Sequence, residues 1–155
     1  PHEPSVCLNY FMAWFTLGIA QMGLSEWRDA VESLKRSLEI AEQTSNRYLM
    51  LFPYSRLADA YLGFEQSRID EAIAASQRAF TIAQESGDKY QEFWIAGQLG
   101  FLYRLTHDYS QSLDYYDHAF ALTDAVRSAI TDTQFRADFA ATVTEEYANA
   151  VLTCI

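Results

Sequence analysis

The stretch Leu17-Gly18-Ile19-Ala20-Gln21 is the clearest sign of the fold, because related stretches return at regular intervals along the chain. They are Leu57-Ala58-Asp59-Ala60-Tyr61 and Leu99-Gly100-Phe101-Leu102-Tyr103, so the leading leucines lie 40 and 42 residues apart. A short polar turn and a second apolar segment follow each stretch. Periods of about 20 to 50 residues are typical of proteins that stack one supersecondary unit. We therefore predict three helix-turn-helix units.

Small residues at two fixed positions predict that the two helices of each unit approach each other closely. The first helix carries a notch, and the second helix carries a small residue that faces it. The notch residues are Gly18, Ala58 and Gly100, and the facing residues are Ala30, Ala72 and Ser112. Helical spacing puts the residue four places later on the same face, where it should pack inward. These inward residues are Leu34, Ser76 and Tyr116.

The three units resemble the tetratricopeptide repeat family over residues 10–125. The period of about 40 residues exceeds the usual value of about 34, so the helices should be longer. The resemblance implies an all-α fold, with a right-handed superhelical stack of three repeats in one domain over residues 1–155. We expect repeats near 5–44, 46–86 and 88–129, followed by a capping or spacer helix over 132–153.

The composition supports helices, because the 21 Ala and 15 Leu far outnumber the 5 Val and 8 Ile. Ala and Leu lose little conformational freedom in a helix, whereas Val and Ile favour strands. Apolar periodicity predicts seven helices. Their expected ranges are 5–23, 26–44, 46–65, 68–86, 88–106, 109–129 and 132–153.

Residues that begin or end helices support these ranges. Asp88 with Gln91 forms a capping box, and Gly87 before it suits a left-handed helix end. Asn46 occupies the place that corresponds to Gly87 one unit earlier, and Thr131 with Gln134 forms another box. Pro53 falls inside the third expected range, where proline disrupts a helix. It predicts a kink near residues 50–52 or a helix that begins there.

Charge and cysteine content exclude several classes of protein. The chain has 11 basic and 21 acidic residues, a net charge of −10, and lacks the basic stripe that nucleic-acid binding needs. The uncharged stretch over residues 4–25 holds Asn9, Thr16 and Gln21, so we expect a helix buried on several sides rather than a membrane span. Cys7 and Cys154 are read as lone thiols in a reducing compartment. We expect a cytoplasmic protein that binds neither nucleic acid nor membrane.

Residues with chemical reactivity are few. His107 lies in a turn, and His118 follows Asp114 by four residues, a spacing that can share a metal but that solvated helix surfaces also carry. The sequence shows no glycine-rich phosphate loop, metalloprotease motif or strand-borne nucleophile. We predict no catalytic residue, no metal and no cofactor, so the protein is not expected to be an enzyme.

The resemblance implies that the first helix of each repeat lines a concave face. This register brings aromatic side chains and two guanidinium groups to that face, which is the composition that binding hot spots favour. We predict a scaffold that binds a peptide or helix there, without the Asn and Lys carboxylate clamp of some members. The predicted groove residues are Phe15, Ile19, Phe52, Arg56, Asp59, Trp94, Gln98, Phe101 and Arg104, flanked by Met12, Thr16, Ser55 and Gly97.

The two ends of the chain suggest alternatives. The last helix carries an apolar residue at every fourth position: Phe135, Phe139, Val143, Tyr147 and Val151. That helix could cap the stack, and it also resembles the helix that joins tetratricopeptide arrays to caspase-like CHAT domains. The chain would then be a fragment, the regulatory or sensor part of a larger signalling protein or protease. Self-association through an uncovered first helix, using Tyr10, Phe11 and Trp14, is a further possibility.

Overall fold

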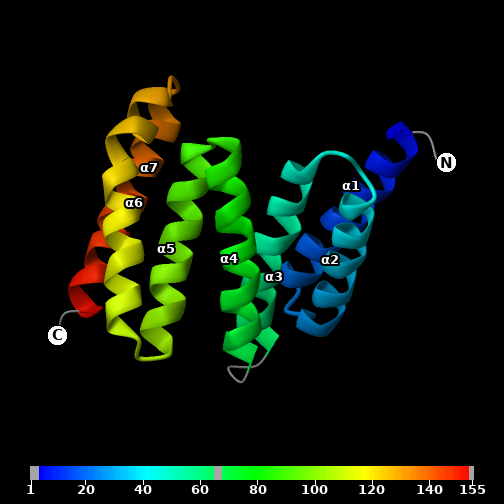
Figure 1. Ribbon diagram of the computed structural model, residues 1–155, viewed down its shortest axis with the longest axis horizontal. Helices are drawn as coiled ribbons and strands as arrows, with labels where there is room; N and C mark the ends of the chain where they lie inside the picture. The colour runs from blue at the N-terminus through cyan, green and yellow to red at the C-terminus, as the bar shows by residue number, and fades with distance from the viewer. Residues whose placement is uncertain (1–3, 65–67, 154–155) are drawn as a thin grey trace. The chain divides into compact units, whose positions relative to one another are not determined.

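The computed structural model describes residues 4–64 and 68–153, and every regular element in these residues is a helix (Figure 1). The all-α prediction is therefore confirmed, and the predicted helix boundaries agree within two residues except at the start of the third helix. The elements are α1 (Pro4–Gly23), α2 (Trp27–Glu42), the 3-10 helix η1 (Arg47–Met50), α3 (Leu51–Phe64), α4 (Ile69–Ser86), α5 (Lys89–Leu105), α6 (Tyr109–Ala129) and α7 (Thr133–Thr153).

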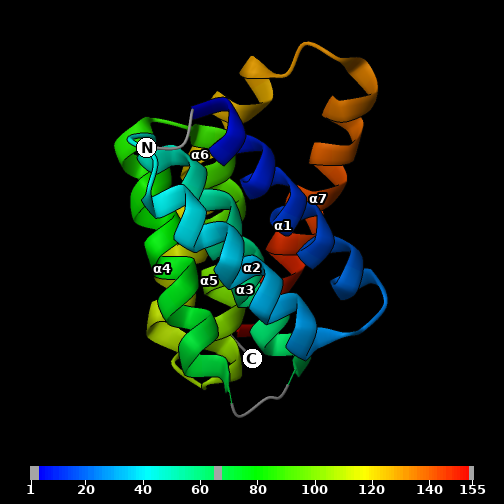
Figure 2. The same ribbon diagram turned by 90° about the vertical axis from the view of Figure 1, so that its right-hand side faces the viewer.

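The chain divides into two compact units, Pro1–Ile82 and Ala83–Ile155. In the first unit α1 packs along α2, and α2 packs on α3 and η1 (Figure 2). In the second unit α5 packs along α6, and α7 contacts both of them. Each unit therefore contains the antiparallel helix pair that the repeat pattern predicts.

The structure confirms the close helix contacts predicted at the notch residues of the first and third repeats. A Cβ atom at Gly100 would lie 2.9 Å from two ring carbons of Tyr116, and a Cβ atom at Gly18 would lie 2.8 Å from Leu34 Cγ. The Ser112 hydroxyl donates a hydrogen bond of 2.7 Å to the Gly100 carbonyl. The helix backbones can approach this closely only because glycine leaves the space open.

The second repeat uses a different close contact. Its notch residue Ala58 is buried, as are Ala72 and Ser76. A Cβ atom at Gly63 would lie 2.5 Å from the indole ring of Trp27, so this glycine makes room for a tryptophan from α2. The turn expected between the helix ranges 46–65 and 68–86, at residues 66 and 67, lies outside the described residues.

Three turns share one hydrogen-bond pattern. Ser25, Gly87 and His107 have positive φ angles of 60°, 73° and 62°. The next residue in each case donates its N–H to the carbonyl five residues earlier, which is the Schellman arrangement. These bonds are Glu26 to Gln21, Asp88 to Ala83 and Asp108 to Tyr103.

Two predicted helix signals were wrong in detail. Asn46 is not a left-handed helix end, because its φ is −99° and its side chain accepts a hydrogen bond from Tyr48 N–H at the start of η1. Asp132, rather than Thr131, caps the last helix by accepting from Phe135 N–H at 2.8 Å. In both places a short side-chain oxygen meets an N–H group that the first turn of a helix leaves without a helical partner.

Pro53 marks the start of a helix, which is one of the two predicted outcomes. η1 ends at Met50, α3 begins at Leu51, and Pro53 is the third residue of α3. The N–H groups of the first residues of a helix have no hydrogen-bond partner within that helix. The missing N–H of proline therefore costs nothing at this position.

The expectation that the first helix is buried on several sides was wrong. Among its described side chains Phe11 is only 2% exposed and stacks on Phe15, whereas Tyr10 and Trp14 face solvent. Phe11 therefore does not belong to the proposed self-association surface. Leu17 is 44% exposed, although its counterparts Leu57 and Leu99 are 3% and 0% exposed. The first repeat thus leaves open a face that is covered in the later repeats.

The last helix does not bury its apolar residues at every fourth position as a single stripe. Steps of four residues rotate about 40° past a full helical turn, so five such positions cannot share one face. Phe139 is buried, but Val151 is 58% exposed. The side that is buried or half-buried instead advances by four and three residues in turn: Phe139, Val143, Glu146, Ala150 and Thr153. That period is typical of helices that pack nearly parallel.

Two findings bear on the class of protein. None of the helices in residues 4–64 and 68–153 is both long and apolar enough to cross a membrane. Cys7 is a half-buried free thiol, and Cys154 lies outside the described residues.

We expect Gly100→Ala to lower the free energy of unfolding by about 1–3 kcal/mol, because the added methyl group overpacks the contact with Tyr116. Urea denaturation followed by circular dichroism measures the change. Gly23→Ala is the matched control, since no atom lies within 4 Å of a Cβ there. Equal effects of the two substitutions would show that the close approach is not important for stability.

Candidate functional site

In the first unit the predicted groove residues include an aromatic cluster from α1 and α3. The rings of Phe15 and Phe52 meet edge to face with centroids 6.5 Å apart, and Tyr48 packs on Phe52 at 5.3 Å. Phe15 and Phe52 are half-buried, and Ile19 on α1 is exposed. The two phenylalanines therefore pack between the helices and also keep part of each ring at the surface.

Arg56 and Asp59 form an ion pair within α3. Arg56 Nη1 lies 3.1 Å from Asp59 Oδ2, and the Arg56 side chain is half exposed. An exposed pair at this spacing contributes at most about 0.5 kcal/mol. Arg56 can therefore exchange this partner for another carboxylate at small cost.

In the second unit the predicted groove residues lie along α5, and α7 covers part of them. Trp94 is 37% exposed and contacts the rings of Tyr90 and Phe93. Gly97 is buried, and a Cβ atom there would lie 3.0 Å from Glu146 Cδ of α7. Gln98 and Phe101 are half-buried and share the face of Trp94 at helical spacing.

Arg104 differs from the expected exposed guanidinium. It lies 5.3 Å from the centre of the Phe101 ring, and its Nε atom is buried without a hydrogen-bond partner. Tyr116 OH and Glu146 Oε2 are also buried and unbonded. Burial and the Glu146 carboxylate raise the pKa of Tyr116 to about 12, although Arg104 opposes this change. Burial, with the neighbouring charge of Glu145, also raises the pKa of Glu146.

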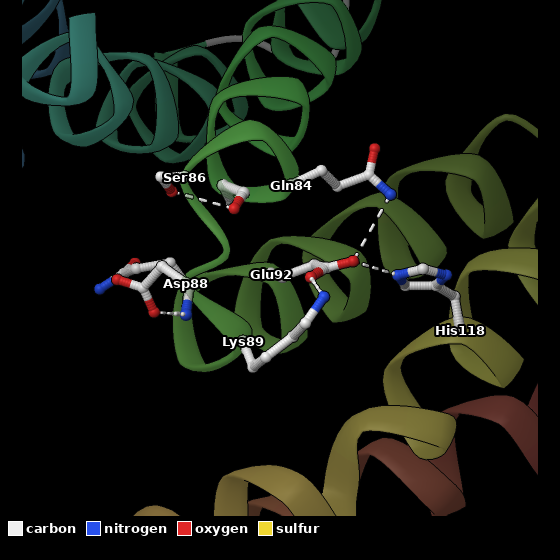
Figure 3. Close-up of polar contacts among 8 residues, drawn as sticks. Gln84, Ser86, Asp88, Lys89, Glu92 and His118 are labelled. Atoms are coloured by element: carbon white, nitrogen blue, oxygen red, sulfur yellow. Dashed lines mark hydrogen bonds and ion pairs between the residues drawn. The ribbon is translucent and has the colours of Figure 1, made fainter.

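A second polar cluster, centred on Glu92, joins α5 to the end of α4 and to α6 (Figure 3). The Glu92 side chain is only 3% exposed and accepts from Lys89 Nζ and His118 Nε2, each at 2.7 Å. Gln84 Nε2 donates a longer bond of 3.4 Å. Burial alone would raise the pKa of Glu92, but the bonds from Lys89 and His118 outweigh it and lower the pKa below 4.5.

The sequence did not reveal this cluster. The spacing of His118 and Asp114 suggested a shared metal ion, whereas the structure bonds His118 to Glu92, 26 residues away. The Lys89–Glu92 spacing of three residues was a visible signal for an ion pair, but nothing in the sequence linked it to His118. Within the described residues no group of three His, Cys, Asp or Glu side chains could hold a metal ion.

Paired helices that contact through small residues, with repeated turns between them, define a helical-repeat scaffold. Residues 54–125 match the family model described as Tetratricopeptide repeat, so this segment belongs to that family. No curated protein matches the chain. Tetratricopeptide repeats are protein–protein interaction modules, and their fold is a scaffold rather than a catalytic type.

We expect Glu92→Gln to destabilise the chain by about 1–3 kcal/mol at neutral pH, because it removes a buried charged acceptor from two hydrogen bonds whose donors are partly exposed. Since folding lowers the pKa of Glu92 below 4.5, its stabilisation is present above about pH 4.5 and is lost as the pH falls through the folded-state value.

Urea denaturation of the parent chain and of the Glu92→Gln variant, at neutral pH and at about pH 3, tests this prediction. The difference between them should shrink at the lower pH. Asp117→Asn, which removes an exposed charge beside His118, should change stability little at either pH. A difference that stays constant with pH would contradict the assigned role of the Glu92 charge.

Proposed function

We propose that the chain is a protein-interaction scaffold that captures a peptide or a helix on the predicted groove residues, and that each unit offers its own face: α1 with α3 in the first unit, and α5 in the second. The observation that carries the proposal is the exposure of aromatic rings at the predicted groove residues. Trp94 is exposed, and Phe15, Phe52 and Phe101 each keep part of their surface accessible. Rigid aromatic side chains supply large contact area with little loss of conformational freedom, which is why they dominate binding hot spots.

The polar groups beside these rings favour a partner with a mixed surface. Arg56 can turn from Asp59 to a carboxylate of the partner, and Asp59 would then accept from a donor group. Gln98 adds an amide beside Trp94 and Phe101. Arg104 instead supports Phe101, because its guanidinium lies over that ring and is partly buried. We also place this scaffold in the cytoplasm, on the basis of its few cysteines.

We expect the double variant Trp94→Ala, Phe101→Ala to weaken partner capture by at least about 30-fold, the effect of losing one or two hot-spot side chains. Capture from a native lysate on the immobilised chain, compared by mass spectrometry, measures the loss. Circular dichroism must show unchanged helix content. Val151→Ala, which truncates an exposed apolar side chain outside the proposed groove, is the control. Unchanged capture by the double variant would refute the groove.

The open face of α1 supports a second role, association of two copies of the chain. Leu17 is exposed where Leu57 and Leu99 are covered, and Tyr10 and Trp14 are exposed on the same helix. A helix from another copy could cover this apolar face as a neighbouring repeat would. We therefore propose self-association through Tyr10, Trp14 and Leu17.

We expect sedimentation velocity to show a concentration-dependent dimer that Leu17→Glu abolishes, because the variant places a charge in an apolar contact. Met12→Glu, at an exposed apolar position of α1 that lies about 140° around the helix from Leu17, tests whether charge alone explains the effect and should act more weakly. A monomer at every concentration would rule out this association.

A further inference from the structure

Helix α7 packs on α5 and α6 through three aromatic pairs. They are Tyr90 with Phe135, Phe93 with Phe139 and Phe120 with Tyr147. Phe139 is buried in its pair, whereas Phe135 and Tyr147 remain exposed. Among the described residues of α7, Phe139 is the only large side chain that is buried. The apolar contact that holds α7 therefore depends mainly on one ring.

Polar atoms that are buried without a hydrogen-bond partner lie in the same three helices. Within residues 4–64 and 68–153 these atoms are Arg104 Nε in α5, Tyr116 OH and Thr123 Oγ1 in α6, and Glu146 Oε2 in α7. Glu146 packs against Gly97 of α5, and its hydrogen bond to Asn149 lies within α7. A carboxylate that loses water and gains no bond across the contact opposes the packing of its helix.

Hydrogen bonds as well as packing join α5 to α6. Ser112 donates to the Gly100 carbonyl at 2.7 Å, and the Tyr116 ring fills the space beside this glycine. His118 of α6 bonds the buried carboxylate of Glu92 in α5. Local opening of a protein begins where the contacts are fewest and least satisfied. We therefore expect α7 to separate while α5 and α6 stay together.

The surface that α7 covers continues into the predicted groove. Phe93 and Gly97 of α5 contact α7, and each directly precedes a predicted groove residue, Trp94 or Gln98. Phe120 of α6 contacts α7 as well. We call Phe93, Gly97 and Phe120 the α7-binding surface. Separation of α7 would give a partner access to this surface beside Trp94.

The segment that lies on the α7-binding surface shows what the surface accepts. It is a helix whose buried and half-buried residues advance by four and three positions in turn. That spacing places them on one side of a helix, whereas an extended peptide would point successive side chains in opposite directions. The fit is poor at one position, because Glu146 brings a carboxylate to Gly97.

We propose that α7 is displaceable, and that an amphipathic helix of the partner takes its place on the α7-binding surface. The partner helix repeats the spacing of Phe139, Val143, Glu146 and Ala150, with an uncharged residue at the position of Glu146. The proposal rests on the scaffold function above and selects a helix as the ligand of the second unit. While α7 is in place, it restricts access to α5.

Native-state hydrogen exchange of the full chain tests whether α7 separates as a unit. We expect the amides of α7 to share one protection factor, at least about 10-fold lower than those of the best protected amides in α5 and α6. Fraying from the end of the helix would instead give protection that falls steadily toward Thr153. Such a gradient, or equal protection in all three helices, would overturn the proposal.

The variant Glu146→Gln removes the charge that opposes the packing of α7. It should slow exchange throughout α7 by at least about 3-fold and leave α5 and α6 unchanged, since one pKa unit corresponds to a tenfold effect. Glu145→Gln, which removes an exposed neighbouring charge, is the matched control and should act more weakly. Equal exchange in Glu146→Gln and the parent chain would refute the role of this carboxylate.

A peptide tests whether the surface accepts a helix from outside the chain. The probe is a fluorescein-labelled peptide of residues 131–153 with Glu146→Gln, titrated into the full chain and followed by fluorescence anisotropy. It should bind the Phe139→Ala chain at least about 10-fold more tightly than the parent chain, whose own α7 competes at a high effective concentration. Val151→Ala, which truncates an exposed side chain of α7, should behave as the parent chain. Hydrogen exchange must show α5 and α6 still protected in Phe139→Ala.

The peptide and the lysate separate this proposal from the scaffold function. Failure of the peptide to bind Phe139→Ala, with α5 and α6 protected, would refute the α7-binding surface even if lysate capture is normal. Peptide binding together with capture that survives Trp94→Ala, Phe101→Ala would refute the predicted groove and leave the α7-binding surface supported. Equal binding of the peptide to the parent and Phe139→Ala chains would show that α7 does not compete for this surface.

Discussion

The second unit depends on the contact between α6 and the bare backbone of α5 at Gly100. Ser112 bonds the Gly100 carbonyl, and the Tyr116 ring lies where a side chain at residue 100 would otherwise be. This contact fixes the distance and the rotation of α6 relative to α5. His118, two residues beyond Tyr116, then reaches Glu92, and Phe120 presents its ring to Tyr147 of α7 with centroids 3.8 Å apart. A small residue therefore determines where two other contacts form.

Glu92, which is buried, and Glu146, which is half-buried, show how the surroundings decide the effect of a charge. Glu92 receives bonds from two basic side chains and an amide, so its charge is compensated in the interior. Glu146 has an oxygen without a partner and a like charge beside it in sequence, so burial opposes its ionisation. The Glu92 carboxylate links helices, whereas the Glu146 carboxylate, when it is charged, makes the packing of α7 less favourable.

The sequence predicted the elements well, because helix propensity, caps and small residues act over a few neighbouring positions. Gly18, Gly100 and the Asp88 cap all had the predicted roles. The prediction from sequence failed where the outcome depends on the direction in which a residue points around its helix, or on partners far away in the sequence. The apolar residues at every fourth position of α7 do not form one stripe, because steps of four residues drift around a helix. Phe11 was expected to be exposed, but it is buried and stacks on Phe15. The Glu92–His118 bond and the contact of Glu146 with Gly97 could not be foreseen, since each needs the final packing of separate helices. The functions of the predicted groove residues remain proposals.

The backbone conformation of Ser25 lowers the stability of the fold at one turn. Its φ of 60° matches the 62° of His107 at the corresponding turn, and serine, like histidine, has a Cβ atom that disfavours this conformation by about 1 kcal/mol. Its side chain is exposed in the turn between α1 and α2, and it is not one of the residues proposed for recognition. Glycine at this position would relieve the strain and leave recognition untouched, so the scaffold could be engineered for greater thermal tolerance without altering what it binds.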